Sequence, residues 1–158
     1  MLDIVLAASE HTGVIQTLWR EYWESLALPA DFQNFANEVA ALPGVYAPPG
    51  GRLLLASLDG APVGTAAFRP LTEHSCEAKR LYVHPRHRGK GIGRTLLTRL
   101  ITEARAAGYR EMFGDPHLHD LRFANVFRVR LLRGPAIFRE PHTRRYLSQA
   151  RSLTAAQR

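Results

Sequence analysis

Cysteine is almost absent from this chain, because Cys76 is the only one among 158 residues. A single cysteine excludes an intramolecular disulfide and is typical of a reducing compartment. Long hydrophobic runs are also missing, and no apolar stretch approaches the roughly 20 residues that a membrane helix needs. The first eight residues do not resemble a signal peptide, since Asp3 interrupts a short apolar run. These absences predict a cytoplasmic protein with no membrane contact.

Lysine and most acidic residues are absent from the last part of the chain. Residues 1–115 contain 12 Lys and Arg and 12 Asp and Glu, which cancel. Residues 116–158 contain nine arginines and only two acids, Asp120 and Glu140, which gives the net charge of +7. Such a tail fits nucleic-acid or membrane contact, or arginines that are simply solvated. Because no helix-turn-helix spacing or aromatic-basic motif accompanies it, binding to nucleic acid is the weaker interpretation.

Length and hydrophobic periodicity predict one mixed α/β domain. Apolar residues at helical spacing favour helices over residues 11–28, 31–42 and 92–107. Alternating or apolar segments between turn residues favour strands over residues 2–6, 52–57, 62–68, 76–83 and 109–113. The order of these elements describes a single domain with one sheet and several helices.

Three glycines on alternate positions, Gly89, Gly91 and Gly93, lie between a predicted strand and the longest predicted helix. Glycine lets the backbone approach a phosphate closely, and the first N–H groups of a helix have no partner within it. The helix dipole also favours negative charge at this end. Four cations surround the turn: Arg86, Arg88, Lys90 and Arg94. The segment therefore predicts an anion-binding site.

Two common phosphate-binding motifs do not fit this turn. A Walker loop requires Ser or Thr after its lysine, but Lys90 is followed by Gly91. A dinucleotide fingerprint requires a third glycine where Arg94 stands.

The run Arg86-His87-Arg88-Gly89-Lys90-Gly91 resembles the [QR]-x-x-G-x-[GA] signature of the GNAT superfamily of N-acetyltransferases. The resemblance covers about residues 2–115. It implies a mixed, mostly antiparallel central sheet flanked by helices, and acetyl-CoA as the co-substrate. It also implies direct transfer of the acetyl group to a primary amine of a small-molecule or peptide acceptor. By this resemblance, Leu81 and Val83 contact pantetheine, and the pyrophosphate is held by Arg88, Gly89, Lys90, Gly91, Ile92, Gly93 and Arg94.

Two residues are candidates for the general base that an amine acceptor needs. Glu77 precedes Leu81 and Val83 by even spacings, so a regular strand would place all three on one face. His84 is the alternative, since it follows the strand and titrates near neutral pH. Cys76 is read as a buried strand residue, because no His/Asp arrangement supports a nucleophile. No ligand set predicts a metal site.

The resemblance stops after Asp115, where the family pattern requires a tyrosine that protonates the departing CoA sulfur. Residues 116–133 contain no tyrosine; Phe127 takes that place without a hydroxyl, and Tyr146 is too distant to be assigned. A thiolate with a pKa near 8.5 can leave unaided. We therefore assign residues 1–133 to the acetyltransferase domain and residues 134–158 to an atypical basic tail, in which prolines and arginines predict no clean strand. A shifted reading frame and genuine divergence both explain such a tail.

The second class of function consistent with these residues is a non-catalytic domain that binds acyl-CoA. The acceptor and the oligomeric state, including a homodimer, stay open at this point.

Overall fold

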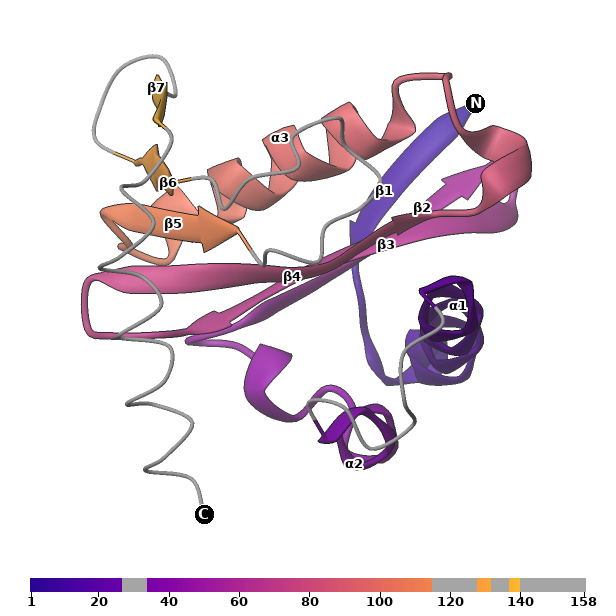
Figure 1. Ribbon diagram of the computed structural model, residues 1–158, viewed down its shortest axis with the longest axis horizontal. Helices are drawn as coiled ribbons and strands as arrows, with labels where there is room; N and C mark the ends of the chain where they lie inside the picture. The colour runs from indigo at the N-terminus through magenta and orange to yellow at the C-terminus, as the bar shows by residue number, and fades with distance from the viewer. Residues whose placement is uncertain (27–33, 115–127, 132–136, 140–158) are drawn as a thin grey trace.

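The computed structural model describes residues 1–26, 34–114, 128–131 and 137–139, and its strands form one sheet (Figure 1). The strands follow one another in the sheet in sequence order: β1 (Leu2–Leu6), β2 (Arg52–Leu58), β3 (Ala61–Pro70), β4 (Ser75–Val83), β5 (Glu111–Gly114), β6 (Arg128–Arg130) and β7 (Ile137–Arg139). Every neighbouring pair is antiparallel except β4 and β5, which are parallel. The prediction of a mixed, mostly antiparallel sheet flanked by helices is confirmed.

Helices cover both faces of this sheet. The α3 helix (Ile92–Ala106) lies on one face, and α1 (Thr12–Ser25) with the short α2 (Phe35–Ala40) lies on the other (Figure 1). Each helix buries the stripe that its apolar periodicity specifies. In α3 the stripe consists of Ile92, Leu96, Leu97, Leu100, Ile101 and Ala104, and in α1 of Ile15, Leu18, Trp19, Tyr22 and Trp23. Two cores result, one on each face of the sheet.

The bounds of three elements, α1, α2 and β5, differ from the expected ones. The first helix ends at Ser25, and α2 begins after Asn34, whose φ of 55° is left-handed. The expected helix start at Asp31 lies outside the described residues. Tyr109 belongs to the loop rather than to β5: its N–H donates to the carbonyl of Ala104 and its hydroxyl to Gly50. The sequence pattern could not predict these contacts of Tyr109, because a loop contact leaves no periodicity.

The expectation of no clean strand beyond residue 134 is wrong for one short segment, β7. The β6 strand pairs with β5, and β7 pairs with β6. Leu131 is buried in the core beneath α3, and its N–H donates to the carbonyl of Arg110 at 2.7 Å. The outer edge of β5 offers backbone donors and acceptors, and three-residue strands can satisfy them without apolar alternation. Phe127 and Tyr146 lie outside the described residues.

Candidate functional site

A β-bulge interrupts β4 between Lys79 and Tyr82. Thr65 of β3 pairs with Tyr82, but Ala67 pairs with Lys79, so β4 has one extra residue between these pairs. Arg80 has a φ of 56°, in the left-handed region. A bulge of this kind puts two successive side chains on one face of the strand. Every later side chain is consequently on the face opposite to the one that simple alternation predicts.

The β4 strand continues past the pairs with β5 that the structure describes. These pairs run to Ala78 and Gly114, the last described residue before Arg128, whereas β4 continues to Val83. His84 donates its N–H to Val63 of β3, and the carbonyl of Val83 points the other way, where it accepts a bond from Arg88. Because backbone groups alternate along a strand, those of Leu81 also face away from β3. The backbone groups of Leu81 and Val83 therefore lie on the edge of β4 toward β5.

The glycine turn lies directly after this edge and begins α3. Gly89 and Gly91 have φ values of 76° and 78°, and no atom lies within 4 Å of a side chain added to either. The bond from the N–H of Thr95 to the carbonyl of Gly91 closes the first turn of the helix at 3.0 Å. The N–H groups of Ile92, Gly93 and Arg94 precede it and have no partner within the helix. Open space, positive φ angles and these helix donors fit a pyrophosphate.

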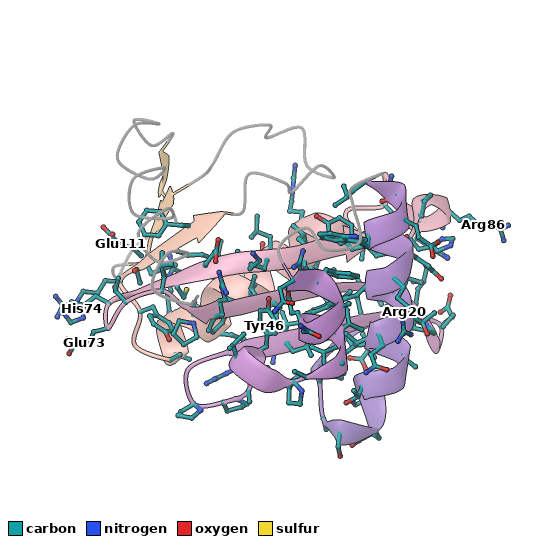
Figure 2. The ribbon with its side chains drawn as sticks, turned by 60° about the horizontal axis from the view of Figure 1, so that its bottom comes forward. Arg20, Tyr46, Glu73, His74, Arg86 and Glu111 are labelled. Atoms are coloured by element: carbon teal, nitrogen blue, oxygen red, sulfur yellow. The ribbon has the colours of Figure 1, made fainter. Side chains whose placement is uncertain are left out.

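Exposed cations surround the turn, as predicted. Arg86 projects away from the molecule before α3 (Figure 2), and Lys90 and Arg94 are also exposed. Arg88 differs from them: its N–H donates to the carbonyl of Pro85 at 3.2 Å, and its Nε donates to Val83 at 3.0 Å. Arg88 therefore also fastens the turn to the end of β4.

Glu77 does not share a face with Leu81 and Val83, so that part of the expectation is wrong. Leu81 and Val83 pack in the core under α3, whereas Glu77 is opposite Arg69 of β3 and accepts a 2.8 Å bond from its Nε. The extra residue at the bulge reverses the alternation between these positions. Glu77 is nevertheless one residue before Ala78, the last residue of β4 with a described partner in β5. Its carboxylate lies on the α1 and α2 face of β4.

A buried polar cluster on this face was missed by sequence analysis. It consists of Glu38 of α2, Tyr46, Arg69, Glu77, Lys79 and Arg80; Glu77, Lys79 and Arg80 are 3–7% exposed. Arg80 donates from Nε to Glu38 at 2.9 Å, and its Nη2 also contacts that carboxylate. The successive cations Lys79 and Arg80 hinted at an irregular strand, because a regular one would place one of them in the apolar core.

Glu38 contacts both Arg80 and Tyr46, and these contacts determine its charge. Burial by itself raises the pKa of Glu38, but hydrogen bonding to Arg80 and its positive charge outweigh burial and lower it. Tyr46 lies beneath the sheet (Figure 2) and donates its hydroxyl to Glu38. Burial first, and the charge of Glu38 second, hold the pKa of Tyr46 well above its usual value. Glu38 is therefore an anion, and Tyr46 is a neutral donor to it.

His84 has a local structural contact. Its Nδ1 accepts a hydrogen bond from the N–H of Arg86 at 3.3 Å, which caps the short 3-10 turn Pro85–His87. The ring centroids of His84 and His87 are 5.9 Å apart. Among the described residues no group of three His, Cys, Asp or Glu side chains is arranged as a metal site. In the same part of the chain, no helix has the length and apolarity to cross a membrane.

Cys76 is fully buried, and burial raises its pKa to about 12. At pH 8 only about one molecule in ten thousand would then carry a thiolate, the form that reacts. We expect an aromatic disulfide reagent to leave native Cys76 unmodified at pH 8 and to label it after unfolding in guanidinium chloride. Absorbance of the released thiolate measures both. Complete labelling of the native protein within minutes would contradict this burial.

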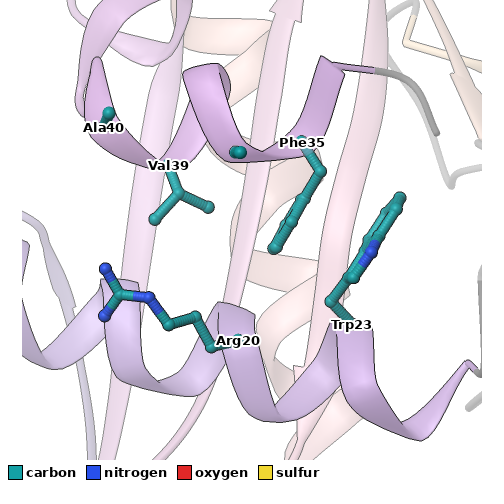
Figure 3. Close-up of a pocket in the computed structure, with 6 residues that line it drawn as sticks. Arg20, Trp23, Phe35, Val39 and Ala40 are labelled. Atoms are coloured by element: carbon teal, nitrogen blue, oxygen red, sulfur yellow. The ribbon is translucent and has the colours of Figure 1, made fainter. Parts of the chain in front are cut away.

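A cavity of about 260 Å³ lies between α1 and α2 (Figure 3). Its walls are Arg20 and Trp23 of α1 with Phe35, Ala36, Val39 and Ala40 of α2. None of these residues belongs to β4 or to the glycine turn. Trp23 and Phe35 stack with centroids 4.1 Å apart, so the cavity borders the aromatic residues around Arg80.

Comparison with known proteins places this geometry among acetyltransferases. The model of the acetyltransferase (GNAT) family matches residues 13–128. An uncharacterized N-acetyltransferase of Schizosaccharomyces pombe is 35% identical over 100 residues, which are 62% of this chain and 61% of that protein. An L-amino acid N-acyltransferase of Escherichia coli is 56% identical over 45 residues, 28% of this chain and 23% of its own. The matched region thus spans less than two thirds of either relative.

The fold has a similar solved counterpart. The structure of a putative acetyltransferase from Salmonella typhimurium with its cofactor acetyl-CoA superposes with a TM-score of 0.57 at 27% sequence identity. The superposition covers 72% of this chain and 69% of that one.

Proposed function

The chain belongs to the acetyltransferase (GNAT) family, and we propose that it transfers the acetyl group of acetyl-CoA to the primary amine of an α-amino acid. One observation carries the proposal: the bulge in β4 turns the backbone groups of Leu81 and Val83 away from β3, and a glycine turn follows β4 at the start of α3. This edge of β4 suits a pantetheine arm, and the turn suits the pyrophosphate. Acetyl-CoA supplies the thioester as acyl donor.

The edge of β4 and the glycine turn have separate roles in this proposal. Backbone groups of Leu81 and Val83 bind and orient the pantetheine amides. Backbone N–H groups of the turn and the start of α3 hold the pyrophosphate, with Lys90 and Arg94 adding positive charge. These contacts fix the thioester beside β4, so that an amine on the α1 and α2 face attacks its carbonyl carbon.

Glu77 is the proposed base. As the amine nitrogen forms its bond to the carbonyl carbon and the carbon–sulfur bond breaks, the amine must lose a proton. The Glu77 carboxylate accepts it, directly or through a water molecule. The thiolate leaves with the bonding electrons and is stable enough to depart without an acid. Arg69 holds the carboxylate in place at 2.8 Å.

An amino-acid acceptor is supported by likeness. The Escherichia coli relative is an L-amino acid N-acyltransferase.

Release of CoA thiol in the presence of paired amines tests this function. We expect L-phenylalanine to give a kcat/KM at least about tenfold above that of 2-phenylethylamine, which lacks only the carboxylate, since a hydrogen bond to a charged group is worth about 1.5–3 kcal/mol. Spermidine and a lysine peptide complete the panel. Equal rates within the pair would contradict an amino-acid acceptor. CoA binding without thiol release for any amine would favour the non-catalytic domain.

A further inference from the structure

The bulge in β4 is held from outside the strand, by the helices on one face. A non-glycine residue at φ 56° is strained and persists only where its surroundings impose that conformation. Arg80 is such a residue, and its side chain is almost fully buried. The structure must therefore contain contacts that favour the left-handed conformation at this position.

Those contacts come from α1 and α2. Glu38 of α2 receives the Arg80 guanidinium through two nitrogens, and Tyr46 holds the same carboxylate. The guanidinium also lies over three aromatic rings, with centroid distances of 5.8 Å to Trp19, 5.4 Å to Trp23 and 5.1 Å to Phe35. Cation–π contacts together with a two-nitrogen contact fix an arginine in direction as well as position.

The bulge lies between the paired part of β4 and the edge assigned to acetyl-CoA. Ala78 is the last residue of β4 with a described partner in β5, Arg80 is two residues later, and Leu81 begins the edge. Without the extra residue, alternation would turn the backbone groups of Leu81 and Val83 toward β3 and their side chains out of the core under α3. The orientation of this edge thus depends on the conformation of Arg80.

We propose that Glu38 is a positioning residue for the cofactor: it holds Arg80 in the left-handed bulge and so orients the Leu81–Val83 edge toward the pantetheine arm. This inference rests on the proposed function, because it assigns that edge to acetyl-CoA. Glu38 acts through Arg80 and does not contact the reacting atoms. The contact between α2 and β4 therefore determines cofactor affinity as well as packing.

Calorimetric titration with CoA tests the inference without an acceptor or turnover. Glu38→Gln keeps the shape of the side chain and removes its charge, and we expect Kd for CoA to rise about tenfold, the equivalent of about 1.4 kcal/mol of bulge stability. Glu24→Gln, on the exposed side of α1, is the matched control and should bind like the parent. If Glu38→Gln does not fold, Arg80→Lys is measured instead. This variant keeps the charge but loses the two-nitrogen contact, and we expect the same rise in Kd for CoA.

A rescue variant separates positioning from simple destabilisation. Glycine adopts a φ of 56° without steric cost, so it can form the bulge without the contact to Glu38. We expect Glu38→Gln/Arg80→Gly to bind CoA within about threefold of the parent, even though it loses more packing than the single variant. Unchanged binding by Glu38→Gln, or a double variant no better than the single, would overturn the inference while leaving the proposed function intact. A parent protein that does not bind CoA would overturn both.

Discussion

Gly91→Asp is expected to lose about a thousandfold in affinity for CoA, because its carboxylate would stand where the pyrophosphate binds. A side chain at Gly91 meets open space, so the new carboxylate would project from the turn without displacing protein atoms. Two like charges 4 Å apart near a protein surface repel by about 4 kcal/mol, which corresponds to roughly three powers of ten. Calorimetric titration of each variant with CoA measures the change.

Gly91→Asn is the matched control, since it has nearly the same size and lacks the charge. Asparagine tolerates the left-handed region better than most residues, so the φ of 78° is strained similarly or less. We expect the asparagine variant to stay within about tenfold of the parent. Equal affinities for the aspartate and asparagine variants would show that no anion binds at this turn, and the proposed cofactor site would then be wrong.

Glu77→Gln is expected to lower kcat about 100- to 10,000-fold, the usual contribution of a general base, while Kd for CoA changes little. The amide keeps the size of the side chain and a hydrogen bond to Arg69 but cannot accept the proton of the amine. Steady-state rates of thiol release give kcat, and calorimetry gives Kd. The separation of these two quantities distinguishes a base from a residue that merely supports the cofactor edge.

Glu73→Gln is the control for Glu77→Gln, because this exposed carboxylate precedes β4 and is not part of the cluster around Glu77. It should keep the parent rate. If Glu77→Gln also retained more than half of that rate, the contact between Glu77 and Arg69 would be structural. His84→Gln would then be the next variant to measure, although the bond of its Nδ1 to the N–H of Arg86 indicates a capping role.

The glycine turn shows how far local sequence determines a site. Alternate glycines followed by a helical apolar stripe specify a left-handed turn and a helix start regardless of their surroundings. Gly89 and Gly91 have positive φ values, and α3 begins at Ile92, where the apolar stripe begins. Membership of the GNAT superfamily, read from this turn, is confirmed by the family match. The binding roles of its residues stay predictions.

In the residues after 134, by contrast, the local sequence did not predict the strand that forms. Prolines and arginines after residue 134 give no strand pattern, yet Ile137–Arg139 pairs with β6. A sheet edge accepts a short strand through backbone groups that every residue except proline carries in full. Composition is therefore a weak guide for strands of this length.

The sequence by itself determined the glycine turn, the helix stripes and the family, because each depends on neighbours within one or two turns of chain. Only the tertiary structure decided which side chains of β4 share a face. That choice depends on one extra residue in β4, and the left-handed Arg80 is held there by Glu38, 42 positions away in the sequence. Alternation along the chain predicted Leu81 on the face of Glu77 and Lys79, whereas the bulge places Arg80 there instead. The reason is physical: the side-chain period of a strand is two, so a single inserted residue reverses every later assignment.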